Sequence, residues 1–164
     1  MRALNVILYS CIFPLLCACA ANPESGSGKC AGRAGNQILV TFDKPGNVNL
    51  DEGIRYYPEC PDPDVKLDVY YPDLPWGNYE KCKVPCLIAI HGGGWSMGNE
   101  KKFAMMAAYM ASKGYVVACI SYRLWPEYDW DCALFDAKRA LAWLKKNASR
   151  YFGDPEKIGV VGGS

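Results

Sequence analysis

Three short apolar runs, separated by two segments of helical composition, constrain the fold of this chain more than any other feature. The runs are residues 86–90, 115–120 and 158–161, and runs of this length and composition are typical of strands covered on both faces. Residues 100–113 and about 131–147, which lie between them, carry apolar side chains at helical spacing. The order strand, helix, strand, helix, strand predicts an α/β fold, with a mostly parallel sheet and helices on both of its faces.

Two earlier segments favour strands, and two further segments favour loops or turns. Residues 37–42 and 66–71 are rich in β-branched and aromatic side chains, and in 66–71 apolar and polar residues alternate. This alternation predicts an antiparallel strand that is half exposed. Residues 72–85 are rich in Pro, Gly and Asn and are expected to form a loop. Asp154-Pro155 predicts the N-cap and first position of a short helical turn.

The first twenty residues differ in composition from the rest and indicate export. Arg2 precedes an apolar run, and Ala18-Cys19-Ala20 supplies the small residues of a signal-peptidase site. A second interpretation is a lipobox at residues 16–19, in which case Cys19 would be lipidated and would anchor the protein to a membrane. The mature protein is therefore expected to be secreted, periplasmic or lipid-anchored. The expected organisation is a signal peptide over 1–20, a flexible leader over 21–36 and a partial α/β domain over 37–164.

The charge balance and the length of the N-terminal apolar run limit the classes of partner that the chain is expected to bind. The chain has 18 basic and 17 acidic residues, for a formal net charge of +1, which gives no electrostatic reason to expect nucleic acid as a partner. The apolar run near the N-terminus is too short to predict a membrane span. No cofactor motif is present in the sequence, and we expect neither a cofactor nor a metal ion.

Nine cysteines are present, of which three fall in the export segment. An even number remains for an oxidising destination, and this pattern favours disulfides without deciding how they pair. Loop-like surroundings make Cys60, Cys82 and Cys86 the favoured disulfide partners, whereas Cys119 lies in an apolar run and could equally be a buried free thiol. A metal site on Cys82 and Cys86 is disfavoured because no second pair of ligands accompanies them. The six cysteines are Cys30, Cys60, Cys82, Cys86, Cys119 and Cys132.

The motif His91-Gly92-Gly93-Gly94-Trp95 directly follows the first apolar run. Consecutive residues without a Cβ let the chain turn tightly and direct backbone N–H groups toward one point, where they can stabilise the oxyanion of an acyl-transfer intermediate. A flexible turn and a phosphate cradle are the alternatives. The phosphate cradle is disfavoured because Trp95 stands where a Gly-Lys-Ser/Thr ending would be needed. His91 is the only histidine, and its position at the strand–loop junction favours support of the loop over a role as general base.

In order and spacing, five motifs resemble a known family. The chain from Leu67 onward is similar to the esterase/lipase branch of the α/β-hydrolases that carries His-Gly-Gly-Gly, near the feruloyl-esterase-like (BD-FAE) and hormone-sensitive-lipase-like groups. The motifs are Leu67-Asp68-Val69-Tyr70, residues 91–95, Ser121 to Glu127, Asp136 with residues 140–144, and residues 154–164.

This resemblance implies the N-terminal half of an α/β-hydrolase fold, ending at the nucleophile elbow. Gly162-Gly163-Ser164 matches the first three positions of Gly-x-Ser-x-Gly, so Ser164 would be the nucleophile. The amides of Gly93 and Gly94 would be oxyanion donors, together with the residue after Ser164, while His91, Gly92 and Trp95 would support the loop. Tyr122, Arg123 and Glu127 could either bracket the site or be surface polar residues.

The resemblance also predicts a serine carboxylic-ester hydrolase that works through an acyl-enzyme. Its expected substrate is a small-molecule ester or an acylated polysaccharide. In this fold the acid and the histidine follow the serine in chain order, so both are expected beyond Ser164. The 164 residues alone should therefore be inactive, and their uncovered apolar sheet edge should make them aggregate. The alternatives are an exported prolyl-peptidase-like serine hydrolase and a non-catalytic binding module with the same fold.

Overall fold

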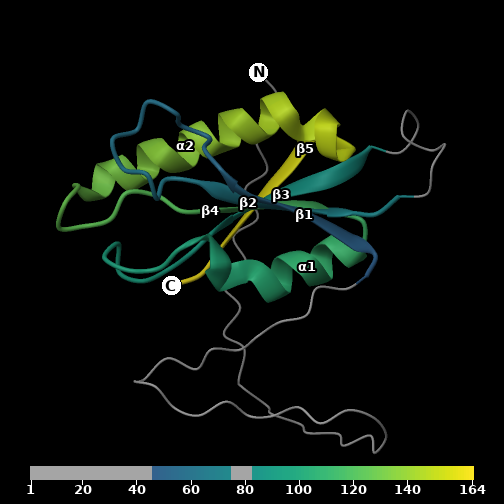
Figure 1. The fold of residues 1–164 in the computed structure, drawn as a ribbon, viewed down its shortest axis with the longest axis horizontal. Helices are drawn as coiled ribbons and strands as arrows, with labels where there is room; N and C mark the ends of the chain where they lie inside the picture. Colours follow the sequence, from purple (N-terminus) through teal and green to yellow (C-terminus); the bar gives the residue numbers. More distant parts are fainter. Residues whose placement is uncertain (1–45, 75–82) are drawn as a thin grey trace, which may run out of the picture. The chain divides into compact units, whose positions relative to one another are not determined.

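The structure, a computed structural model, describes residues 46–74 and 83–164 and consists of one sheet with helices on its two faces (Figure 1). The sheet has five strands in the order β1-β2-β4-β3-β5. The α/β fold predicted from the order of apolar runs and helical segments is confirmed. The elements are β1 (Val48–Ile54), β2 (Leu67–Pro72), β3 (Val84–Ile90), the 3-10 helix η1 (Glu100–Phe103), α1 (Ala104–Ser112), β4 (Val116–Ile120), α2 (Trp130–Asn147), the 3-10 helix η2 (Ala148–Tyr151) and β5 (Gly153–Gly162).

The three predicted apolar strands lie side by side and run in the same direction. β3 pairs in parallel with β4 on one side and with β5 on the other, whereas β2 pairs antiparallel with both of its neighbours, β1 and β4. Ile90, the last residue of β3, is opposite both Ile120 of β4 and Gly162 of β5. The residues that follow these three strands therefore emerge at one edge of the sheet, where open α/β sheets bind their ligands.

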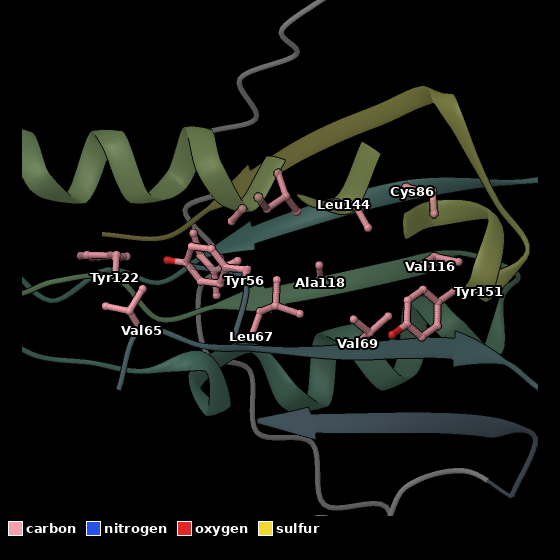
Figure 2. Close-up of a cluster of buried hydrophobic side chains, with 14 of the residues drawn as sticks. Tyr56, Val65, Leu67, Val69, Cys86, Val116, Ala118, Tyr122, Leu144 and Tyr151 are labelled. Carbon is pink, nitrogen blue, oxygen red and sulfur yellow. The ribbon is translucent and has the colours of Figure 1, made fainter. Parts of the chain in front are cut away.

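Each face of the sheet is covered by one α-helix, and each covered face forms its own apolar cluster. Figure 2 shows the cluster on the α2 side, in which Leu144 of α2 packs near Cys86 of β3 and Ala118 of β4. On the other face, alanines of α1 pack against Val117 and Cys119 of β4. Side chains from β3 and β4 enter both clusters, which is why their sequences are apolar without alternation.

β2 is antiparallel as expected, but the prediction that it is half exposed was wrong. Both faces are buried, and the polar side chain of Asp68 is 1% exposed. Asp68 tolerates this position because its Oδ1 accepts a hydrogen bond from the Gly53 amide (2.8 Å) and its Oδ2 lies 2.7 Å from Lys101 Nζ. A buried carboxylate needs partners of this kind, and here they come from β1 and η1.

Two further local predictions are corrected by the structure. The helix expected over residues 100–113 begins as the 3-10 turn η1 and becomes α-helical only at Ala104. Asp154-Pro155 does not begin a helical turn but lies inside β5, where the register with β3 shifts between Gly153 and Ile158. The Asp154 carboxylate accepts a hydrogen bond from the Glu156 amide (3.0 Å), the type of contact expected of an N-cap, but here it closes an irregularity in a strand.

The prediction of disulfides involving Cys60 and Cys86 was wrong, since both are buried free thiols. Cys86 lies in β3, and a Cβ added to Gly153 would be 2.4 Å from its sulfur, so the thiol fills a space left by that glycine. Cys119 is also a buried free thiol, which was one of the two alternatives, and Cys132 is free as well. In these surroundings cysteine acts as a small apolar side chain.

Several predictions concern residues outside 46–74 and 83–164. These are the signal peptide, the lipobox, the leader, the strand at 37–42, Cys30 and Cys82. Within the described ranges, no helix has the length and apolar composition that crossing a membrane requires.

Candidate active site

The glycine loop and the end of β5 meet at the edge of the sheet where the parallel strands end. The loop starts at His91, one residue after β3, and Gly163 and Ser164 follow β5, its direct neighbour. The Gly163 amide donates a hydrogen bond to the carbonyl oxygen of Ile90 (3.3 Å), which continues the strand pairing past the end of β5. The two predicted parts of the site are thus brought together by the pairing of β3 with β5.

Gly92 is in direct contact with the backbone of Ser164. A Cβ added to Gly92 would lie 2.6 Å from the Cα of Ser164 and 2.5 Å from the carbonyl oxygen of Gly163. Both distances are shorter than a carbon side chain can tolerate, and both neighbours are backbone atoms. The absence of a side chain at position 92 is therefore what allows the loop to approach Ser164.

The loop after Gly92 is a tight turn in left-handed backbone conformations. Gly93 has a φ of 140°, and a Cβ there would lie 2.0 Å from the carbonyl oxygen of Met97. The Gly93 carbonyl accepts hydrogen bonds from the amides of Ser96 and Met97, both at 3.2 Å. Gly94 (φ 58°) and Trp95 (φ 59°) follow in the left-handed region, which a tryptophan rarely adopts.

The ring of His91 is buried beneath this loop. It stacks on Tyr122 with centroids 4.2 Å apart, and the Tyr122 hydroxyl donates a hydrogen bond to the His91 carbonyl (2.8 Å). Nδ1 is 3.1 Å from the Gly92 carbonyl oxygen, which can only accept, so Nδ1 carries the proton. Burial lowers the pKa of His91, and its Nε2 has no hydrogen-bond partner in the described part of the chain. A neutral ring held in this way stabilises the start of the loop.

Three polar contacts around the loop were not anticipated from the sequence. Glu100 is buried, with its amide donating to the Ser121 hydroxyl (3.0 Å) and its carboxylate accepting from the same hydroxyl. Lys102 Nζ donates to the carbonyl oxygen of Gly92 (3.0 Å). Their positions in the sequence could have indicated a place near the loop, because Ser121 directly follows a buried strand and Glu100 and Lys102 follow the glycine loop.

The strand-end loop that follows β4 is anchored by a buried ion pair. The Arg123 guanidinium binds both carboxylate oxygens of Asp136, at 2.9 and 2.8 Å, and the Arg123 amide donates to the same carboxylate (3.1 Å). The hydrogen bonds from Asp136 raise the pKa of Arg123 above its ordinary value. Of the two interpretations for Tyr122 and Arg123, the contacts therefore favour bracketing residues, whereas Glu127 is exposed.

A pocket of about 340 Å³ lies beside this site, at the carboxyl end of β4. Its lining includes Ser121 and Tyr122 and four carboxylates, which belong to Asp62, Asp64, Glu100 and Glu127. Neither the triple glycine from Gly92 to Gly94 nor Ser164 contributes to the lining. The pocket therefore lies beside the residues that support the glycine loop, and not at the contact between Gly92 and Ser164.

Comparisons with known proteins agree with this geometry. The "Probable carboxylic ester hydrolase LipM" of Mycobacterium tuberculosis is 41% identical over 81 residues, which cover 49% of this chain and 19% of LipM. Esterase B from Lactobacillus rhamnosis matches the structure with a TM-score of 0.66 at 30% identity, over 76% of this chain and 38% of that protein. A truncated carbohydrate esterase from gut microbiota matches with a TM-score of 0.59 at 28% identity, over 71% and 39%. The chain thus spans less than two fifths of each of these proteins.

The match to a family extends over residues 67–164, which is more than half of the chain and includes the glycine loop and the end of β5. The strand order, the covering helices and the similarity to esterase structures all agree with that match. The chain belongs to the BD-FAE family and has the α/β-hydrolase fold.

Proposed function

We propose that the protein carrying this chain is a serine carboxylic-ester hydrolase and that Ser164 is its nucleophile. The observation that carries the proposal is the contact between Gly92 and the backbone of Ser164, which brings a serine at the end of a parallel strand beside a triple-glycine turn. A hydroxyl and backbone N–H donors at one edge of a sheet are the elements that acyl transfer needs. The esterases that resemble this chain support the same reaction class.

In the proposed reaction, Ser164 Oγ attacks the ester carbonyl carbon and loses its proton to a base. The carbonyl π electrons move onto the oxygen, and the amides of Gly93 and Gly94, with that of the residue after Ser164, stabilise the negative charge. Collapse of this intermediate breaks the bond to the alcohol, which leaves with the proton that the base received. Water then attacks the acyl-enzyme in the same way, releasing the carboxylic acid and restoring the Ser164 hydroxyl.

The base is assigned to residues that follow Ser164. In α/β-hydrolases the acid and the histidine come after the serine in chain order. His91 is a poor candidate for this role because its Nδ1–H is engaged by the Gly92 carbonyl and burial lowers its pKa. We assign to His91, Gly92 and Trp95 the support of the oxyanion loop.

For the substrate class, we propose acyl groups carried on polysaccharide. The similarity to a carbohydrate esterase from gut microbiota supports this choice. The side chains of Trp95 and Trp125 are 58% and 59% exposed, and the Trp125 amide donates to the Trp95 carbonyl (2.9 Å), so the two residues are tied together at the loop. Exposed indole rings offer broad apolar faces with a polar edge, which suit the faces of sugar rings.

The proposed location is outside the cytoplasm, on the basis of the export signal at residues 1–20. A signal peptidase cut after Ala20 would give a secreted or periplasmic protein, and lipidation at Cys19 would give an anchored one. Mass spectrometry of the mature N-terminus would distinguish a free Ala21 from a lipid-modified Cys19.

The reaction class is tested by treating the full-length protein with a fluorophosphonate and mapping the modified residue. We expect modification of Ser164 together with hydrolysis of p-nitrophenyl acetate, and loss of both in Ser164→Ala. Labelling accompanied by cleavage of a prolyl peptide, but not of esters, would favour the prolyl-peptidase-like alternative. The absence of labelling and of hydrolysis would favour a binding module and would reject the proposal.

A further inference from the structure

One carbonyl oxygen in the glycine loop receives two side-chain donors from different parts of the chain. The Gly92 carbonyl oxygen is 3.1 Å from Nδ1 of His91 and 3.0 Å from Nζ of Lys102. A carbonyl oxygen has two lone pairs, so both contacts can be satisfied at once. We propose that Lys102 is a positioning residue that holds the peptide between Gly92 and Gly93 in the orientation the oxyanion requires. This inference rests on the function proposed above.

The peptide bond itself transmits the effect. The bond between Gly92 and Gly93 is trans, and a trans peptide is planar with its C=O and N–H pointing in opposite directions. Fixing the direction of the Gly92 carbonyl therefore fixes the direction of the Gly93 N–H, one of the two proposed oxyanion donors in the loop. Glycine on both sides of this bond leaves the peptide plane free to rotate unless something holds it.

The backbone of Lys102 is held in place by its neighbours. Asn99 caps the 3-10 helix η1, since its side chain accepts a hydrogen bond from the Lys101 amide (3.1 Å). Glu100 is buried against Ser121, and the Lys101 ammonium lies 2.7 Å from the buried carboxylate of Asp68. Only the side chain of Lys102 remains to be ordered when it reaches the loop, which limits the entropic cost of the contact.

Lys102 differs from the adjacent lysine in what it binds. Lys101 pairs with the carboxylates of Glu52 and Asp68, whereas no carboxylate of the described residues lies within ion-pairing distance of Lys102. Its contact with the Gly92 carbonyl crosses ten positions of the sequence and spans the whole glycine loop. A lysine that served only as a solvated surface charge would have no need for this contact.

The test compares Lys102→Met with Lys102→Arg in the full-length protein, with Lys113→Met as the matched control. Lys113 is an exposed lysine at the end of α1 whose ammonium lies over the Tyr109 ring, outside the proposed machinery. For an exposed charged contact, we expect Lys102→Met to lower kcat about three- to tenfold with KM unchanged. Lys102→Arg should recover most of the rate, because a guanidinium can also donate to the carbonyl, and Lys113→Met should match the wild type.

A second readout does not depend on activity. With selective ¹⁵N-glycine labelling, the NMR order parameter of the Gly93 amide should fall from about 0.85, typical of rigid backbone, toward about 0.6 in Lys102→Met. It should not fall in Lys102→Arg or Lys113→Met. Unchanged kcat and order parameter, an effect on KM alone, or equal losses in the Met and Arg variants would each overturn the inference. If the wild type neither hydrolyses esters nor reacts with the fluorophosphonate, the proposed function fails, while the order parameter still decides the role of Lys102.

Discussion

Replacing Gly92 by alanine tests the contact between the glycine loop and Ser164 with the smallest possible change. The added Cβ would lie 2.5 Å from the Gly163 carbonyl oxygen and 2.6 Å from the Cα of Ser164. Real Cβ contacts essentially never lie under 3.0 Å and are ordinary from 3.4 Å, so the 2.5 Å contact must open by 0.5 to 0.9 Å. Overpacking of this kind destabilises a protein by about 1–3 kcal/mol. A displacement of about 1 Å in a catalytic arrangement can lower the rate about 100-fold.

The matched control is Gly46→Ala, because a Cβ at Gly46 would meet nothing within 4 Å. We expect Gly92→Ala in the full-length protein to lose about 100-fold in kcat on p-nitrophenyl acetate and to melt at a lower temperature. Gly46→Ala should keep the rate and melting temperature of the wild type. A Gly92→Ala enzyme with unaltered kcat would refute the reasoning, because it would show that Ser164 can lose its present position against the loop without losing activity.

Three further predictions concern buried groups. Arg123→Met leaves the fully buried carboxylate of Asp136 without its ion-pair partner. The free energy of unfolding, measured by urea denaturation, should fall by about 3–5 kcal/mol, and a loss below about 1 kcal/mol would contradict this. Burial raises the pKa of Cys86 to about 11 and that of Cys119 to about 12. Near pH 8 neither thiol should therefore react with a disulfide reagent until urea is added, and rapid labelling of the folded protein would be inconsistent with that burial. Burial also lowers the pKa of His91 below 6.5, so just below pH 6.5 the unfolded chain binds more protons than the folded chain. The contribution of His91 to the free energy of unfolding should therefore be complete above pH 6.5 and decline as the pH falls. An imidazole NMR titration with a pKa above 6.5 would be evidence against it.

Much of the fold could be predicted because its signals are local. β3, β4 and β5 are apolar runs bounded by glycine or by helical segments, and their common direction follows from the helices between them. The glycine loop was visible for the same reason, since its three glycines are consecutive. The spatial order was not visible, because β3 lies between β4 and β5 although it precedes both in the chain.

The predictions that failed depended on partners distant in the sequence. The burial of Asp68 depends on partners from β1 and η1, the Gly53 amide and the Lys101 ammonium, and alternation within β2 says nothing about those contacts. Asp154 makes the hydrogen bond typical of an N-cap, yet pairing with β3 keeps the segment in a strand. Cys86 was assigned to a disulfide because of its neighbours in the sequence, whereas the space left by Gly153 explains its burial.

The most direct measurement of the site is a crystal structure of the full-length protein after reaction with a phosphonate ester. The phosphorus should be bonded to Ser164 Oγ, and one phosphonyl oxygen should lie about 2.7–3.1 Å from the amide nitrogens of Gly93 and Gly94. A phosphonate attached to another residue, or an oxygen directed away from those two amides, would contradict the proposed nucleophile and oxyanion donors.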